Sequence, residues 1–206
     1  MTQSVVVMGK GRLAIRICEW FTLNNKYKIA SVVPVAPEPE WCDSLTAWCD
    51  LNNVPLIKGG DYKDVPDGDI GLAVSAFYDK IIDKNFIDRC DKIINVHNSP
   101  LPKYRGVRSI NWALKDKQIE HGVTIHEIQE GIDTGPIISQ IKYSIYPEFE
   151  EVCDVYDKAI DYAYLLFEKT MPIIDKVIPR RQVGWMASYH GKKDIHKLGD
   201  RQGIRR

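Results

Sequence analysis

Short apolar runs and amphipathic stretches follow one another along most of the chain, and this pattern predicts strands that alternate with helices. Residues 4–8 (SVVVM) form a continuous β-branched run, which is typical of a strand buried on both faces of a parallel sheet. Similar runs predict further strands at residues 29–35, 54–57, 70–76, 92–97 and 137–143, and an alternation of apolar and polar residues predicts another at 122–128. Apolar residues three or four positions apart predict helices at residues 13–23, 40–51 and 107–114, and a long helix after residue 148 that kinks before Pro172. The alternation favours an α/β domain with a largely parallel sheet.

The composition excludes several classes of protein. Hydrophobic residues make up 44% and charged residues 27% of 206, so the chain is neither disordered nor a membrane protein. Lys+Arg and Asp+Glu number 28 each, which removes the electrostatic case for a general nucleic-acid or membrane-surface binder. No signal peptide or long apolar segment is visible, and the five cysteines lack paired short spacings. We therefore expect a cytoplasmic protein with free thiols.

An amide and an imidazole, Asn95 and His97, stand two residues apart at the end of a predicted strand. Residues at this spacing share one face of the strand, and open α/β sheets bind ligands at the carboxyl ends of their strands. The amide can donate a hydrogen bond to an oxygen that gains charge, and the imidazole can accept a proton near neutral pH. The alternative is that both groups satisfy nearby backbone atoms as the strand ends.

Asp133 lies in the segment EGIDTGP between two predicted strands. Glycines on both sides of an Asp commonly mark a turn, but a carboxylate in such a loop can also orient an imidazole. The histidines lack metal-ligand spacing with carboxylates, so we expect no metal.

Two basic segments are candidates for binding a phosphorylated substrate. The first directly follows the first predicted strand and opens a helix, where backbone amides suit a phosphate; it matches neither the Walker nor the dinucleotide motif, and a tight turn fits equally well. The second is a Pro-rich loop after Asn95 and His97, which either grips a phosphorylated substrate or is simply solvated. The residues concerned are Gly9, Lys10, Gly11 and Arg12 in the first segment, and Ser99, Pro100, Lys103, Tyr104, Arg105 and Arg108 in the second.

Residues 94–106 (INVHNSPLPKYRG) and 122–135 (GVTIHEIQEGIDTG) together resemble the folate-dependent formyltransferases. The family pattern is N-x-H, a Pro-containing loop that ends in Gly, then G-x-T and D-x-G, and all four parts occur here in order. The resemblance covers residues 5–143 and implies a Rossmann-like, largely parallel twisted sheet flanked by helices. It also implies N10-formyltetrahydrofolate as the formyl donor and Asn95, His97 and Asp133 as the catalytic residues. The pterin is expected against Phe77, Tyr78, Lys80, Ile81, Ile82, Ile128, Gly131 and Ile132.

Within this family, the stretches PLPKYRGVRSINWAL and HGVTIHEI look most like the enzymes that formylate nucleotide-linked amino sugars. Phosphoribosylglycinamide formyltransferase is the alternative, although that branch carries small polar residues where Arg12 and Leu13 stand here. A folate-binding module without catalysis is a third interpretation. We expect a catalytic domain at residues 1–178 and a short basic tail at 179–206. The resemblance implies a nucleotide sugar and folate as ligands and suggests a homodimer, and the balanced charge argues against a nucleic-acid or membrane partner.

Overall fold

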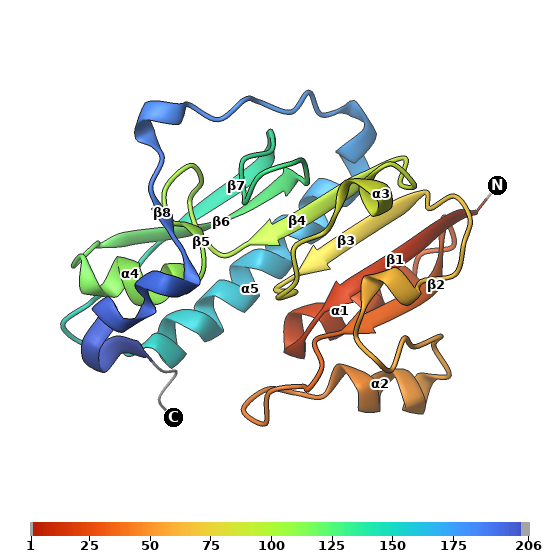
Figure 1. The fold of residues 1–206 in the computed structure, drawn as a ribbon, viewed down its shortest axis with the longest axis horizontal. Helices are drawn as coiled ribbons and strands as arrows, with labels where there is room; N and C mark the ends of the chain where they lie inside the picture. Colours follow the sequence, from red (N-terminus) through yellow and green to blue (C-terminus); the bar gives the residue numbers. More distant parts are fainter. Residues whose placement is uncertain (1, 203–206) are drawn as a thin grey trace. The chain divides into compact units, whose positions relative to one another are not determined.

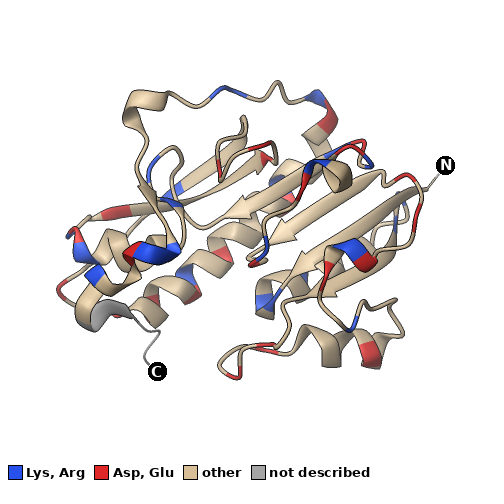
Figure 2. Ribbon diagram, in the orientation of Figure 1, with Lys and Arg blue, Asp and Glu red and all other residues tan. Residues whose placement is uncertain are grey.

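The computed structural model describes residues 2–202, and the chain forms two compact units, Met1–Val96 and His97–Arg206 (Figure 1). Six of the strands belong to a mixed, mostly parallel sheet flanked by helices, which confirms the predicted fold class. Acidic and basic residues lie mainly on the helices and loops, whereas the strands are largely uncharged (Figure 2). No helix within residues 2–202 is long and apolar enough to cross a membrane.

The first unit is built on four parallel strands in the order β2-β1-β3-β4. They are β1 (Gln3–Gly9), β2 (Tyr27–Pro34), β3 (Leu72–Ala76) and β4 (Ile93–His97), the last of which ends on the first residue of the second unit. The continuous valines of β1 are completely buried, as the unbroken apolar run predicts. Gly9 pairs with Ala76, and Ala76 with Val96. The carboxyl ends of β1, β3 and β4 therefore meet at one edge of this sheet.

The helices of the first unit are α1 (Gly11–Thr22), α2 (Leu45–Asn52) and α3 (Lys84–Ile87), with a 3-10 turn η1 (Tyr62–Asp64). The prediction of a helix from residue 40 was wrong by about one turn. Ser44 caps the helix by accepting the Ala47 N–H, and the Glu38 carboxylate accepts the N–H groups of Leu45 and Thr46. These acceptors fix the start of α2 because they satisfy amides that have no partner inside the helix.

Two strand predictions in the first unit also need correction. Residues 54–57 do not form a strand; Leu56 makes a single isolated parallel bridge with Val32. β3 begins at Leu72 rather than at Ile70, which forms an isolated bridge with Cys90. Both segments are short apolar runs, for which the sequence pattern does not set the extent of pairing.

The second unit contains the antiparallel pair β6 (Glu120–Glu127) and β7 (Ile137–Ser144), with α4 (Ser109–Lys115) and α5 (Val152–Thr170). The apolar side of α5 packs against β6, β7 and α4. The long helix ends at Thr170 and continues as the 3-10 helix η2 (Met171–Lys176), because Pro172 cannot donate the hydrogen bond that the α-helix requires.

Beyond η2, the chain adds elements that the sequence pattern did not predict. The two-residue strand β8 (Tyr189–His190) pairs in parallel with the equally short β5 (Arg105–Gly106), which precedes α4, and the 3-10 helices η3 (Gly184–Met186) and η4 (Lys192–Gln202) flank β8. The expected basic tail is thus a structured part of the second unit up to residue 202.

Candidate active site

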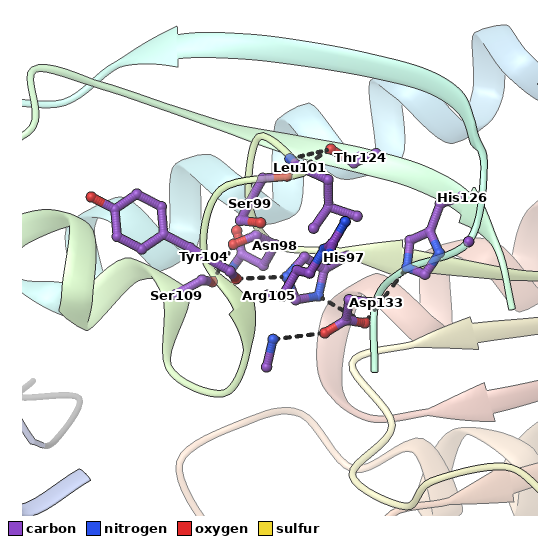
Figure 3. A network of polar contacts seen from close by, with 12 residues as sticks. His97, Asn98, Ser99, Leu101, Tyr104, Arg105, Ser109, Thr124, His126 and Asp133 are labelled. Carbon is purple, nitrogen blue, oxygen red and sulfur yellow. Dashed lines mark hydrogen bonds and ion pairs between the residues drawn. The ribbon is translucent and has the colours of Figure 1, made fainter. Parts of the chain in front are cut away.

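The imidazole of His97 is buried at the end of β4 and faces an oxygen atom at each of its two nitrogens. Nε2 donates to the carbonyl of Tyr104 at 3.0 Å, because a carbonyl can only accept. Nδ1 lies 3.5 Å from Oδ1 of Asp133 (Figure 3). The structure therefore brings together His97 and Asp133, which are far apart in the sequence, and it places a carboxylate where it would offset a positive charge on the ring.

The Asp133 carboxylate is the centre of this cluster. Its Oδ1 faces both His97 and His126, the latter through Nε2 at 3.6 Å, and its Oδ2 accepts the backbone N–H of Gly106 at 2.8 Å. Burial raises the pKa of Asp133, but the two histidines and the Gly106 amide outweigh that effect and hold the pKa well below its ordinary value. Asp133 is therefore ionised over the pH range in which histidine titrates.

His126 joins the cluster without having been singled out from the sequence. It lies on β6 with its side chain 3% exposed, and its Nδ1–H donates to the carbonyl of Glu127 at 2.8 Å. The ring centroids of His97 and His126 are 6.2 Å apart. A signal was present in the sequence, because strand alternation puts Thr124 and His126 on one face of β6, and two polar residues on a buried strand indicate a functional or hydrogen-bonded face.

Asn95 lies on β4, where its backbone is in register with Ser75 of β3. It precedes His97 by two residues, with the completely enclosed Val96 between them. The strand thus carries the amide and the imidazole on one face near its carboxyl end, as the sequence predicts. The catalytic roles of Asn95, His97 and Asp133 remain predictions.

The loop that follows β4 is held from inside by Thr124. Its Oγ1 donates to the carbonyl of Ser99 at 2.7 Å and accepts the N–H of Leu101 at 3.1 Å. Ser99 is itself completely buried, and its hydroxyl donates to the carbonyl of Lys103. Ser99, a predicted substrate-binding residue, therefore shapes the loop in this structure, whereas Lys103 is exposed.

Tyr104 and Arg105, two more of the predicted substrate-binding residues, make contacts inside the second unit. The Tyr104 ring is buried and its hydroxyl donates to Asp116 at 3.0 Å. The Arg105 guanidinium donates to Oε1 of Gln182, from Nη2 at 2.7 Å and from Nε at 3.1 Å. Arg108 is exposed. Lys103 and Arg108 are thus the cations of this loop that are exposed to solvent.

The segment Gly9-Lys10-Gly11-Arg12 contains a glycine that close packing requires. A Cβ on Gly9 would lie 2.2 Å from the carbonyl oxygen of Ala76 in β3. Gly11 has φ +63 and begins α1, whose N-terminus has no side-chain cap. Lys10 lies over the ring of Trp41, with Nζ 5.5 Å from its centroid. The close approach explains why residue 9 is a glycine, and phosphate binding at the start of α1 stays a prediction.

The first predicted folate-binding segment directly follows β3. Phe77 has a positive φ of +60, and the Tyr78 hydroxyl donates to the carbonyl of Gly60 at 2.7 Å. Lys80 forms an ion pair with Asp61 at 3.2 Å. These contacts fix the course of the segment, while the side chain of Ile81 is 73% exposed.

The second predicted folate-binding segment lies between β6 and β7. Gly131 has φ +105, and the side chain of Ile132 is 38% exposed. Each of the two segments thus offers an apolar side chain to solvent, which fits contact with a flat aromatic group such as a pterin. Among the side chains described, those of residues 2–199, no group of three or more His, Cys, Asp or Glu is placed to hold a metal ion.

Residues 65–169, slightly more than half of the chain, match the family described as formyl transferase. The chain belongs to the formyl transferase family. The resemblance drawn from the sequence motifs is thereby confirmed.

The phosphoribosylglycinamide formyltransferase of Haemophilus influenzae is 42% identical over 86 residues, which cover 40% of this chain and 41% of that protein. This chain spans less than half the length of the curated relatives it matches.

Two solved structures share the fold over nearly the whole chain. The N-formyltransferase from Helicobacter canadensis, in complex with folinic acid and dTDP-3-aminofucose, has a TM-score of 0.82 at 26% identity and covers 94% of this chain and 72% of its own. The formyltransferase PseJ from Anoxybacillus kamchatkensis, in complex with UDP-4,6-dideoxy-4-formamido-L-AltNAc and tetrahydrofolate, has a TM-score of 0.67 at 26% identity and covers 98% and 94%.

Proposed function

We propose that this protein transfers a formyl group from N10-formyltetrahydrofolate to the primary amine of a nucleotide-linked amino sugar. The observation that carries the proposal is the buried contact between His97 and Asp133, with 3.5 Å between Nδ1 and Oδ1. An ionised carboxylate beside an imidazole at the end of a buried strand is an arrangement suited to proton transfer. The family membership and the two sugar-enzyme structures support the choice of reaction.

In this proposal, each of the three polar residues has one task. The amide of Asn95 donates a hydrogen bond to the formyl oxygen, which gains negative charge when the amine attacks. His97 takes the proton that the attacking amine loses and returns one to the folate nitrogen as the carbon–nitrogen bond breaks. Asp133 stays ionised and offsets the positive charge on His97 while the proton is held there.

N10-formyltetrahydrofolate supplies the carbon that is transferred, and the residues proposed to hold it are those of the segments 77–82 and 128–132. The side chain of Ile81 in the first segment is exposed, and so is that of Ile132 in the second. The hydroxyl of Tyr78 and the ammonium of Lys80 make contacts within the first unit, so we propose that they set the shape of the segment. Lys103 and Arg108 would hold the phosphates of the acceptor.

A second acceptor, phosphoribosylglycinamide, is favoured by one specific observation, the 42% identity to the Haemophilus influenzae enzyme. It carries a primary amine and a phosphate, so the same proton transfers and the same exposed cations would serve it. The two candidates therefore differ only in the acceptor.

An acceptor panel tests the proposal. The purified full chain is mixed with N10-formyltetrahydrofolate and, in turn, with thymidine-, uridine- and guanosine-diphosphate amino sugars and with phosphoribosylglycinamide, and tetrahydrofolate formation is measured. We expect turnover with a nucleotide amino sugar, and we expect the change His97→Ala to lower kcat by at least about 100-fold. Turnover with phosphoribosylglycinamide alone would replace the first acceptor by the second. Wild-type turnover in His97→Ala would remove this residue from the mechanism.

A further inference from the structure

The part of the chain beyond η2 crosses two loops of the second unit that are far apart in sequence. Residues 180–190, here called the C-terminal segment, begin with Arg180, which exchanges two backbone hydrogen bonds of 2.8 Å with Ile137 at the start of β7. They end at β8, where Arg105 donates its backbone N–H to the carbonyl of Ser188 at 2.9 Å. One continuous segment is therefore bonded to the loop of Asp133 and to the loop of Arg105.

Between these two attachments, a single side chain is bonded to both loops. Nε2 of Gln182 donates to the carbonyl oxygens of Asp133 at 2.9 Å and Gly135 at 2.7 Å. Its Oε1 accepts both hydrogen bonds from the guanidinium of Arg105. A carboxamide offers two donors and an acceptor at its end, which is the combination that this position uses.

These contacts close a ring around the candidate catalytic carboxylate. Gln182 holds the backbone of Asp133 and the side chain of Arg105, and the next residue after Arg105, Gly106, donates its N–H to Oδ2 of Asp133 at 2.8 Å. Asp133 has φ +52, a conformation that residues with a Cβ rarely adopt unless surrounding contacts enforce it. The direction of its carboxylate toward His97 thus depends on bonds to its carbonyl as well as to its side chain.

We propose that Gln182 is a positioning residue that acts through Asp133: it fixes the turn at Asp133 and the Gly106 amide in one arrangement, so that Oδ1 is directed at His97. The effect on turnover rests on the proposed function, whereas the effect on the geometry of Asp133 does not. Displacing a catalytic group by about 1 Å can cost about 100-fold in rate. We therefore expect loss of the Gln182 contacts to lower kcat by about 10- to 100-fold.

The change Gln182→Glu tests this with almost no change in shape. It keeps an acceptor for Arg105 but replaces the two N–H donors with an oxygen that faces the carbonyls of Asp133 and Gly135. Gln182→Met, which is neutral and of similar length, removes the donors without adding charge and serves as the second variant if the first fails to fold. Gln118→Glu is the matched control, because Gln118 lies outside the ring and its amide makes only a 3.4 Å contact with the carbonyl of Asp116.

Two measurements separate positioning from general destabilisation. The first is hydrogen exchange of the Gly106 amide by NMR, which needs no substrate; we expect at least about tenfold faster exchange in the Gln182 variants and no change in Gln118→Glu. The second is kcat in a double-mutant cycle with Asp133→Asn. If Gln182 acts through Asp133, its substitution costs little further rate once the carboxylate is gone, and the two losses do not multiply.

The outcomes distinguish the two proposals. If the wild-type protein transfers no formyl group to any acceptor, the proposed function fails, while faster Gly106 exchange would still support the positioning role. If Gly106 exchanges at the wild-type rate in both Gln182 variants, or if the losses in kcat multiply in the double variant, the positioning role is overturned.

Discussion

His121 should make the protein sensitive to mild acid. Its side chain is completely buried on β6, and Nε2–H donates to the carbonyl of Asn98 at 3.0 Å. Nδ1 has no hydrogen-bond partner among the described side chains of residues 2–199 or the backbone of residues 2–202. Protonation would therefore place both a charge and an unpaired N–H in the interior. Burial, with a smaller contribution from a charge on His97, lowers the pKa of His121 from 6.5 to about 4, against the opposing effect of the Asn98 carbonyl.

The sign of the effect follows from this lowered pKa. Below about pH 6.5, the unfolded chain binds a proton at His121 that the folded protein does not bind, so acid favours unfolding. The loss of stability grows as the pH falls and levels off near pH 4, where the folded protein also becomes protonated. A difference of this size corresponds to about 3 kcal/mol in the free energy of unfolding, at about 1.4 kcal/mol for each pH unit. The low pKa of Asp133 acts in the same direction only below about pH 4, so it falls outside this window.

The change His121→Gln tests this, because Nε2 of glutamine can still donate to the Asn98 carbonyl but does not titrate. Urea titrations followed by tryptophan fluorescence would give the free energy of unfolding at several values between pH 7 and pH 4. We expect the wild type to lose up to about 3 kcal/mol more than the variant across this range. His196→Gln, at an exposed histidine, is the control and should follow the wild type. Parallel curves for the wild type and His121→Gln would refute the reasoning.

Two further substitutions test the loops of the second unit. Gly135→Ala should destabilise the protein by about 1–3 kcal/mol in urea titrations, because a Cβ there would lie 1.8 Å from the carbonyl oxygen of Glu127; an unchanged midpoint would contradict this contact. Thr124→Val should cost about 1–3 kcal/mol because it leaves buried backbone groups of the loop after β4 without their hydroxyl partner, and Thr124→Ser should recover most of that loss.

The sequence pattern was sufficient for the strands that carry the candidate site. β4 was predicted almost to the residue, because a β-branched run is followed by prolines that cannot continue it. The alternation along β6 likewise placed its ends within two residues. The contact between His97 and Asp133 could not be predicted from the pattern, because periodicity gives no information on contacts between distant loops. It was expected from the family resemblance.

The contacts of the C-terminal segment had no such signal. β5 and β8 have two residues each, too few for a period to be visible, and Gln182 stands in an irregular stretch between exposed residues. The pattern was also insufficient at α2, where the apolar spacing continues before Ser44. Ser44 is a preferred cap residue, and a helix that begins directly after it matches the observed start of α2.

Most of the strained backbone in the described part of the second unit lies in the two loops around the Asp133 carboxylate. Tyr104, Arg108 and Asp133, three of the four non-glycine residues with positive φ there, have φ between +52 and +59, where a Cβ is unfavourable; the fourth, Lys117, follows α4. Two of these residues are held by the C-terminal segment: Tyr104 donates its N–H to the hydroxyl of Ser188 at 2.7 Å, and Asp133 is held through Gln182. Strain and the bonds that offset it thus occupy the same few residues. This arrangement is expected where a carboxylate has to be held in one orientation before a substrate binds. A loop that could relax would let the carboxylate turn away from that orientation.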